Sequence, residues 1–227
     1  RETADARVLR VCGGWAGRRL RPIVHRHADR AGPFETMREF AGYIAEKAGK
    51  GCSFDLEQVM EEPGGNMPIA ANALAHLGLD TYCVGALGLP EPAPVFRTMH
   101  GSCELHSVSN PGYCDALEFS DGKLMMATNT YIDALDYERI VDRIPEVELA
   151  RQIERSDALA FLNWGEMIQS NAIWEGILLR VLPRCGFTEK KLLFVDFSDF
   201  SKRGAEEVEP PPGTLERAAA VLFHHRT

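Results

Sequence analysis

Two short apolar stretches, separated by a helical one, constrain the fold of this chain more than any other feature. Residues 157–162 carry the run ALAFL, and residues 191–196 have the sequence KLLFVD, so both are predicted to be buried strands. Between them, residues 170–182 place Ile173, Trp174 and Ile177 at helical spacing. A strand, a helix and a second strand in this order form parallel sheet through a right-handed crossover. We therefore predict an α/β fold with a mostly parallel central sheet flanked by helices.

A glycine-rich turn precedes another predicted helix. Pro63, Gly64 and Gly65 mark the turn, and apolar residues at helical spacing follow from about Asn66 to a stop at Gly78. Paired glycines before a helix let the backbone approach a ligand closely, and the unpaired N–H groups of the first turn favour polar or anionic groups. On spacing alone, an ordinary turn capped by Asn66 is the more frequent arrangement.

The order of motifs within residues 63–88 is more specific. A PGGN turn, an Ala/Asn-rich helix, an LG stop and a VGALG strand end follow one another there. This segment resembles the ribokinase-like (PfkB) carbohydrate kinases, closely over residues 63–88 and more loosely over residues 96–203. The resemblance implies a ribokinase-like fold with a small β lid. It also implies candidate contacts to an acceptor sugar, which are Gly64, Gly65, Asn66, Asn72 and Asn129.

For Asn129, which follows a predicted strand, a role as a turn former is the competing interpretation.

Ligands of parallel sheets collect at the carboxyl ends of the strands, so polar clusters that follow strands are candidate sites. Three such clusters should meet, at residues 85–88, 163–166 and 196–203. The last two contain candidates for the vicinity of a nucleotide or its phosphates, which are Asn163, Asp196, Asp199, Lys202 and Arg203. Carboxylates help to order a metal-bound nucleotide, and cationic side chains bind phosphate. Helix capping and surface charge explain the same residues equally well.

The remaining predicted strands supply the lid. Partial alternation over residues 52–60, and short strands with tight connections over residues 104–127, place lid strands within residues 50–63 and 103–128. An amphipathic helix is predicted over residues 34–48. Residues 18–30, rich in Arg and His, are interpreted as an exposed polar segment, or as one in which Arg18, Arg19 and Arg21 attract anions, rather than as a metal pair of His25 and His27. We predict a single ribokinase-like domain over residues 1–227.

Two departures from the family pattern limit what the resemblance implies. The Asp that usually follows the first strand is missing, since residues 13–17 have the sequence GGWAG. The GAGD motif, whose Asp acts as the base in the family, does not occur among the 227 residues, so no catalytic residue is assigned. A helix predicted over residues 214–222 ought to lead into another strand, yet the sequence ends in FHHRT.

The domain is therefore expected to be incomplete at its C-terminus. Two accounts of this are open: a longer natural protein, or a natural short form without catalytic machinery. The first is favoured, because a sheet that stops before its last strands would expose a long apolar edge.

Composition argues against several classes of function. With 45% hydrophobic and 26% charged residues the chain is globular, and its formal charge of −8 argues against a nucleic-acid surface. No apolar run approaches the roughly 20 residues that cross a bilayer, and the N-terminus lacks the apolar core of a signal peptide, so a cytoplasmic location is expected. The six cysteines form no CxxC pair, so neither a zinc ribbon nor a redox site is indicated.

The leading hypothesis is a carbohydrate or nucleoside kinase that transfers the γ-phosphate of ATP to a sugar hydroxyl with Mg²⁺. Both cofactors are implied by the resemblance alone. The alternatives are a non-catalytic sugar-binding protein and a structural subunit with a degenerate kinase fold. The expected partners are a small-molecule sugar or nucleoside and, through an exposed sheet edge, a second copy in a homodimer. Neither nucleic acid nor a membrane is expected as a partner.

Overall fold

The computed structural model describes residues 7–13, 15–27, 30–186 and 191–204. Contacts divide the chain into two compact units. Unit 1 comprises residues 1–15, 63–112 and 129–227, and unit 2 comprises residues 16–62 and 113–128. The helix predicted over residues 214–222 lies outside the described residues. Within the described part, no helix is long and apolar enough to cross a membrane.

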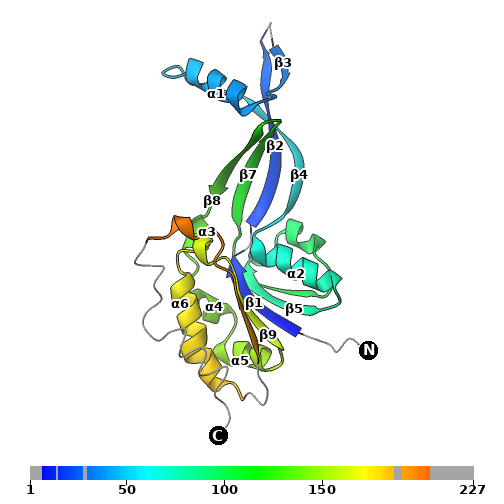
Figure 1. Cartoon of the computed structure of the whole chain (residues 1–227), viewed down its shortest axis with the longest axis vertical. Coiled ribbons are helices and arrows are strands. Elements are labelled where there is room, and N and C mark those ends of the chain that lie inside the picture. Colours follow the sequence, from blue (N-terminus) through cyan, green and yellow to red (C-terminus); the bar gives the residue numbers. More distant parts are fainter. Residues whose placement is uncertain (1–6, 14, 28–29, 187–190, 205–227) are drawn as a thin grey trace. The chain divides into compact units, whose positions relative to one another are not determined.

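A five-stranded parallel sheet forms the centre of unit 1 (Figure 1). Its spatial order is β10-β9-β1-β5-β6, and every neighbouring pair runs parallel. The strands are β1 (Arg7–Gly13), β5 (Asp80–Ala86), β6 (Cys103–Ser109), β9 (Ala158–Phe161) and β10 (Leu192–Val195). The predicted mostly parallel sheet is confirmed, and so is the pairing of β9 with β10 across a helical crossover.

Helices flank this sheet, with α2 to one side and α4, α5 and α6 to the other in Figure 1. They are α2 (Asn66–His76), α3 (Thr130–Asp133), α4 (Tyr137–Arg143), α5 (Glu146–Glu154) and α6 (Ser170–Gly176), with 3₁₀ turns at η1 (Pro94–Thr98), η2 (Trp164–Glu166) and η5 (Phe200–Lys202). Helix α2 packs on β1, β5 and β6, and buries Met67 and Ala71. Strand β5 is buried at every residue after its first, as expected of a parallel strand covered on both faces.

The helix predicted over residues 170–182 changes geometry along its length. Helix α6 ends at Gly176, a π-helical turn η3 (Ile177–Val181) follows, and a 3₁₀ turn η4 (Leu182–Arg184) ends the segment. Pro183 has no N–H to donate to an α-helical bond, which accounts for the final change. The predicted apolar face is confirmed by five buried residues, Ile173, Trp174, Ile177, Leu178 and Val181.

Gly176 lies directly against the ring of Tyr137. A Cβ added at Gly176 would lie 2.1 Å from Cδ2 of that ring, far inside van der Waals contact. The ring is held from two sides, since its hydroxyl donates to Oε1 of Glu146 at 2.9 Å and the guanidinium of Arg180 lies 4.6 Å from its centroid. The hydrogen bond from Tyr137 is also the main reason why the pKa of Glu146 lies below its ordinary value.

We therefore expect Gly176→Ala to lower the free energy of unfolding by about 1–3 kcal/mol, as overpacking of a core does. Urea unfolding followed by circular dichroism measures this. The control is Gly42→Ala in α1 (Met37–Glu46), since an added Cβ there meets nothing within 4 Å. A Gly176→Ala curve that superimposes on the wild type would contradict the packing.

Unit 2 is a sheet with one helix. Its elements are β2 (Trp15–His27), β3 (Arg30–Pro33), α1, β4 (Asp55–Gly64), β7 (Gly112–Phe119) and β8 (Gly122–Thr128). The spatial order is β3-β2-β7-β8, with β4 also paired to β2. Two ranges were expected to supply lid strands. Residues 50–63 contribute to β4, and residues 103–128 contribute β7 and β8. The second range also contains β6, which instead pairs with β5 in the parallel sheet of unit 1.

Residues 18–30, which the sequence predicted only as an exposed polar segment, contribute to β2 and β3. Their sequence shows no apolar alternation, and it is the pairing of β2 with β3, β4 and β7 that supplies partners for its backbone. Arg18 donates from Nε and Nη2 to the two carboxylate oxygens of Asp115 at 2.8 and 2.9 Å. The side chains of His25 and His27 lie outside the described part of the structure.

A small aromatic cluster holds α1 against the sheet of unit 2. Its buried members are Leu20, Phe34, Phe40 and Leu117. The rings of Phe34 and Phe40 meet edge-on with centroids 5.2 Å apart. This confirms the amphipathic helix predicted over residues 34–48, and the antiparallel pairing of β7 with β8 confirms the hairpin predicted at Asp121-Gly122.

Candidate functional site

The carboxyl ends of β9 and β10 meet the N-terminus of α2 in unit 1. Asn163 follows β9, Asp196 follows β10, and Asn66 is the first residue of α2. The backbone N–H of Asn66 donates to Oδ1 of Asn163 at 3.1 Å, and its side-chain Nδ2 donates to Oδ2 of Asp196 at 2.6 Å. The structure thus brings together three residues that the sequence had assigned to separate sugar and nucleotide regions.

Asp196 is the acceptor at the centre of this junction. Besides the bond from Asn66, its Oδ2 accepts from the backbone N–H of Asn163 at 3.1 Å, and its Oδ1 accepts from that of Ser198 at 3.0 Å. Hydrogen bonds to an ionised carboxylate are about twice as strong as neutral ones. Three donors from three segments therefore hold this carboxylate in one orientation.

Asn163 links the loop after β10 to α2. It is 1% exposed, and its backbone lies in the left-handed region, with φ 63° and ψ 37°. Asparagine adopts this conformation more readily than most residues. Because its N–H bonds Asp196 while its side-chain oxygen bonds Asn66, one buried residue joins both partners.

Gly165 allows the loops after β9 and β10 to approach closely. Its N–H donates to the carbonyl oxygen of Phe197 at 2.9 Å. A Cβ at this position would lie 2.4 Å from the carbonyl oxygen of Asp199 and 2.9 Å from that of Phe197. Gly165 lies in the predicted polar cluster at residues 163–166 but was not among the predicted site residues, because a glycine two residues after Asn163 is the only local signal for this close approach.

The glycine turn before α2 has the conformation that glycine favours. Gly65 has φ 88° and is the N-cap residue of α2, with no side chain capping the helix. Asn66 is the first helical residue rather than the cap, so the interpretation of Asn66 as a capping residue is wrong. Its side chain is half-buried and points to Asp196, while Gly64 ends β4.

The other two predicted sugar contacts lie on other segments of unit 1, Asn72 further along α2 and Asn129 before α3. Oδ1 of Asn72 accepts from the backbone N–H of His100 at 2.8 Å, and His100 precedes the amino end of β6. Asn129 is the N-cap residue of α3, where its side chain makes no capping bond. Within the described residues, no hydrogen bond joins either side chain to Asn66.

The third predicted cluster, residues 85–88, is bonded to the end of β6. The N–H of Leu87 donates to Oγ of Ser107 at 3.1 Å, and that of Gly88 donates to the carbonyl oxygen of Ser109 at 2.9 Å. These bonds belong to the pairing of adjacent strand ends. They do not extend to Asn163 or Asp196.

The two cations predicted near phosphate already have protein partners. Nζ of Lys202 lies 2.7 and 2.8 Å from the carboxylate oxygens of Glu166. The guanidinium of Arg203 lies 4.8 Å from the centroid of the Trp164 ring. It also donates to three backbone carbonyl oxygens, which belong to Trp164, Met167 and Ile168. Both side chains therefore brace the loops that follow β9 and β10.

Asp199 is the exposed carboxylate on the loop after β10. Its Oδ1 accepts from the hydroxyl of Ser201 at 2.6 Å and from the N–H of Ser201 at 3.1 Å. These two bonds hold the pKa of Asp199 below its ordinary value, and the bond from the Ser201 hydroxyl has the larger effect. The carboxyl group of Asp199 is therefore ionised at neutral pH. Among the residues that the structure describes, no three His, Cys, Asp or Glu side chains are grouped as a metal site.

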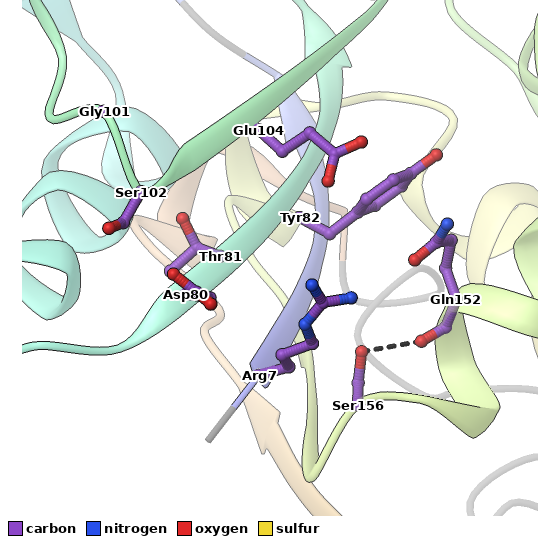
Figure 2. A pocket seen from close by; sticks show the side chains of 9 residues that line it. All are labelled: Arg7, Asp80, Thr81, Tyr82, Gly101, Ser102, Glu104, Gln152 and Ser156. Atoms are coloured by element: carbon purple, nitrogen blue, oxygen red, sulfur yellow. Dashed lines mark hydrogen bonds between the residues drawn. The ribbon is translucent and has the colours of Figure 1, made fainter. Parts of the chain in front are cut away.

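A cleft of about 310 Å³ in unit 1 opens at the opposite edge of the parallel sheet. Figure 2 shows Arg7, Tyr82, Glu104 and Gln152 around it, and Arg7 lies at the amino end of β1. Burial is the main cause that raises the pKa of Tyr82. None of the site residues predicted from the sequence lines this cleft, so it is not the predicted acceptor site.

The fold of unit 1, with polar groups gathered at the carboxyl ends of its parallel strands, defines the class as ribokinase-like. A carbohydrate kinase from Agrobacterium tumefaciens matches with a TM-score of 0.59 and 18% sequence identity, covering 96% of this chain and 63% of that one. A ribokinase from Arabidopsis thaliana, solved with ribose and ATP, matches with a TM-score of 0.50 and 13% identity, covering 86% and 54%. At these identities the likeness is one of fold.

Sequence similarity is more specific. The family model described as prokaryotic ketohexokinase matches residues 4–223, and this chain belongs to that family. A ketohexokinase from Haloferax volcanii is 29% identical over 175 residues, which cover 76% of this chain and 46% of that protein. The chain thus spans less than half the length of this relative. The resemblance to ribokinase-like carbohydrate kinases that the sequence predicted is confirmed.

Proposed function

We propose that this protein is a carbohydrate kinase that transfers the γ-phosphate of ATP to a hydroxyl of a sugar, with a ketohexose as the first substrate to test. The observation that carries the proposal is the junction of Asn66 with Asn163 and Asp196 at the carboxyl edge of the parallel sheet. Membership of the prokaryotic ketohexokinase family supports it, as does the ketohexokinase of Haloferax volcanii.

The proposed acceptor site consists of Gly64, Gly65 and Asn66. The positive φ of Gly65 brings backbone, rather than a side chain, to the surface of the turn, so a sugar can approach it closely. The carboxamide of Asn66 adds a polar group able to bond a hydroxyl. We leave Asn72 out of this site, because its side chain is bonded to the backbone N–H of His100. Asn129, before α3, stays a separate candidate for the sugar.

ATP and Mg²⁺ are the proposed phosphate donor and cofactor. ATP would supply the phosphoryl group, and an Mg²⁺ ion bound to its phosphates needs only one or two protein carboxylates as further ligands. Asp199 fits that role, since it is exposed and ionised. Lys202 and Arg203 do not fit a phosphate as they are arranged, because Glu166 and backbone carbonyls occupy them. We therefore derive no phosphoryl-transfer step from these residues and assign no catalytic base.

The test is a coupled assay of ADP release by the full-length protein with ATP, Mg²⁺ and D-fructose, D-glucose, D-ribose or adenosine. We expect sugar-dependent ADP release with D-fructose as the preferred acceptor. Calorimetry with the same compounds separates the alternatives. Saturable sugar binding without turnover would support a non-catalytic binding protein, and the absence of both would overturn the proposal.

We further propose that a second copy of this chain covers the sheet of unit 2. Strands β4 and β8 are exposed over most or all of their length, and carry six exposed apolar side chains, Leu56, Val59, Met60, Leu124, Met125 and Met126. These two strands lie on either side of β2 and β7, and exposed sheet edges and apolar side chains are commonly covered by association. Light scattering should give the mass of a dimer over a range of concentrations, and a monomer throughout would contradict this.

A further inference from the structure

The bond between Asn66 and Asp196 determines which end of the Asn66 carboxamide faces a ligand. Oδ2 of Asp196 already acts as an acceptor, since it takes the backbone N–H of Asn163, so the group of Asn66 that lies 2.6 Å from it is the amide nitrogen, which donates. The orientation of an asparagine amide is otherwise an assignment from its surroundings. Here the chemistry of the partner makes the assignment.

Asp196 cannot turn away to release this amide. Its Oδ2 is shared between Asn66 and the N–H of Asn163, and its Oδ1 is held by the N–H of Ser198. A rotation of the carboxylate would break bonds to two backbone donors, and leaving such donors unsatisfied is costly. The carboxylate therefore acts as a fixed template for the Asn66 side chain.

The side-chain oxygen of Asn66 is then the atom left for a ligand. Within the described residues, no donor bonds this oxygen, and Asn66 is half-buried at the first turn of α2. Its N–H is already bonded to Asn163. The polar group that Asn66 offers beside the Gly65 turn is consequently an acceptor.

We propose that Asp196 is a positioning residue which orients Asn66 so that the acceptor site selects a hydrogen-bond donor, a free sugar hydroxyl, at that point of the substrate. This inference rests on the proposed sugar-binding function. It moves Asp196 from the phosphate vicinity, where the sequence had put it, to the sugar side of the site. A carbonyl, ether or fluorine in place of that hydroxyl meets an oxygen to which it cannot donate.

Binding of sugar analogues to the full-length protein tests the orientation without any substitution. The probes are D-fructose and its monodeoxy and monodeoxyfluoro derivatives, compared by calorimetry. At one position, we expect the hydroxyl to bind about threefold to tenfold more tightly than either replacement, and the two replacements to bind equally, since neither donates. Asn66→Ala should remove the difference at that position alone, which identifies the hydroxyl concerned.

Substitutions at Asp196 test its positioning role. In Asp196→Ala the amide of Asn66 is free to turn its nitrogen outward, so the preference for hydroxyl over fluorine should fall towards one. Asp196→Asn keeps one oxygen able to accept from Asn66 and Asn163, so it should retain most of the preference. The matched control is Asp157→Ala, since Asp157 accepts the N–H of Arg7 at 2.8 Å before the amino end of β9 and should leave the preference unchanged.

Each outcome decides the proposal. A fluoro analogue that binds the wild type as tightly as the hydroxyl at every position overturns it, as does an Asp196→Ala protein that weakens all analogues by the same factor. If Asp196→Ala does not fold, binding of D-fructose and its deoxy and fluoro derivatives to the wild type still decides how the Asn66 amide is oriented. Asp196→Ser then takes the place of Asp196→Ala in testing the positioning role. If the wild type binds no sugar, the proposed function fails too, whereas sugar binding without selectivity overturns only this inference.

Discussion

Gly165→Ala should destabilise unit 1 by about 3 kcal/mol, the upper end of the usual cost of overpacking, and should weaken sugar binding together with stability. The added Cβ would lie 2.4 Å from the carbonyl oxygen and 2.7 Å from the carbonyl carbon of Asp199. These are backbone atoms, so no side-chain rotation relieves the clash. The loop after β10 must move, and it carries Asp196, to which Asn66 and Asn163 are bonded.

Thermal and urea unfolding measure the first effect, and calorimetry with D-fructose measures the second. The matched control is Gly101→Ala, also in unit 1, where an added Cβ has nothing within 4 Å. We expect the control to stay within about 0.5 kcal/mol of the wild type, as surface substitutions do. If Gly165→Ala kept both the wild-type stability and the wild-type affinity, the close approach of these two loops would be wrong.

Asn66→Ala should raise the dissociation constant for the sugar by about tenfold or more, because it removes the proposed hydrogen bond to the substrate and a donor to Asp196. The loss at Asp196 adds a cost in stability, since one carboxylate oxygen keeps only the bond from Asn163. Calorimetry on the full-length protein measures the affinity, and thermal unfolding shows how much of the change reflects the fold.

Asn72→Ala is the matched control on the same helix. Oδ1 of Asn72 accepts the N–H of His100 at 2.8 Å, so its loss should lower stability by about 1 kcal/mol. We expect the dissociation constant for the sugar to remain within about twofold of the wild type, because the change removes no contact of the proposed site. Weaker sugar binding in Asn72→Ala than in Asn66→Ala would reverse the assignment of the two asparagines.

The apolar patterns of the chain were sufficient to predict the parallel sheet. The run at residues 158–161 is a strand buried at all but its first residue, as predicted. The prediction that residues 192–195 are also buried is wrong, because β10 lies at the edge of the described sheet and leaves Leu192 and Phe194 exposed. The hairpin at Asp121-Gly122 was predictable because its turn chemistry is local. Strand β2 was missed, because its polar residues carry no alternation and its partners are distant in the chain.

The candidate site was predictable only in part. The glycine turn before α2 and the polar residues after β9 and β10 could be identified, since glycine conformation and strand ends are local properties. The pairing of Asn66 with Asp196 could not, because both residues hydrogen-bond well with many partners and lie far apart in the sequence. The same reason explains why Lys202 and Arg203 were assigned to phosphate, although Glu166 and backbone carbonyls hold them.

The sequence by itself determined the α/β class, the turn at Gly64 and Gly65, and the family resemblance, because periodicity, backbone preference and motif order are written in neighbouring residues. Only the tertiary structure decided the partner of each polar side chain. Hydrogen bonds are short and directional, so the choice among several chemically equivalent partners depends on where distant segments come to lie. Asp196 could bind a metal, a phosphate-linked water or an amide in principle, and the meeting of β9, β10 and α2 selects the amide of Asn66.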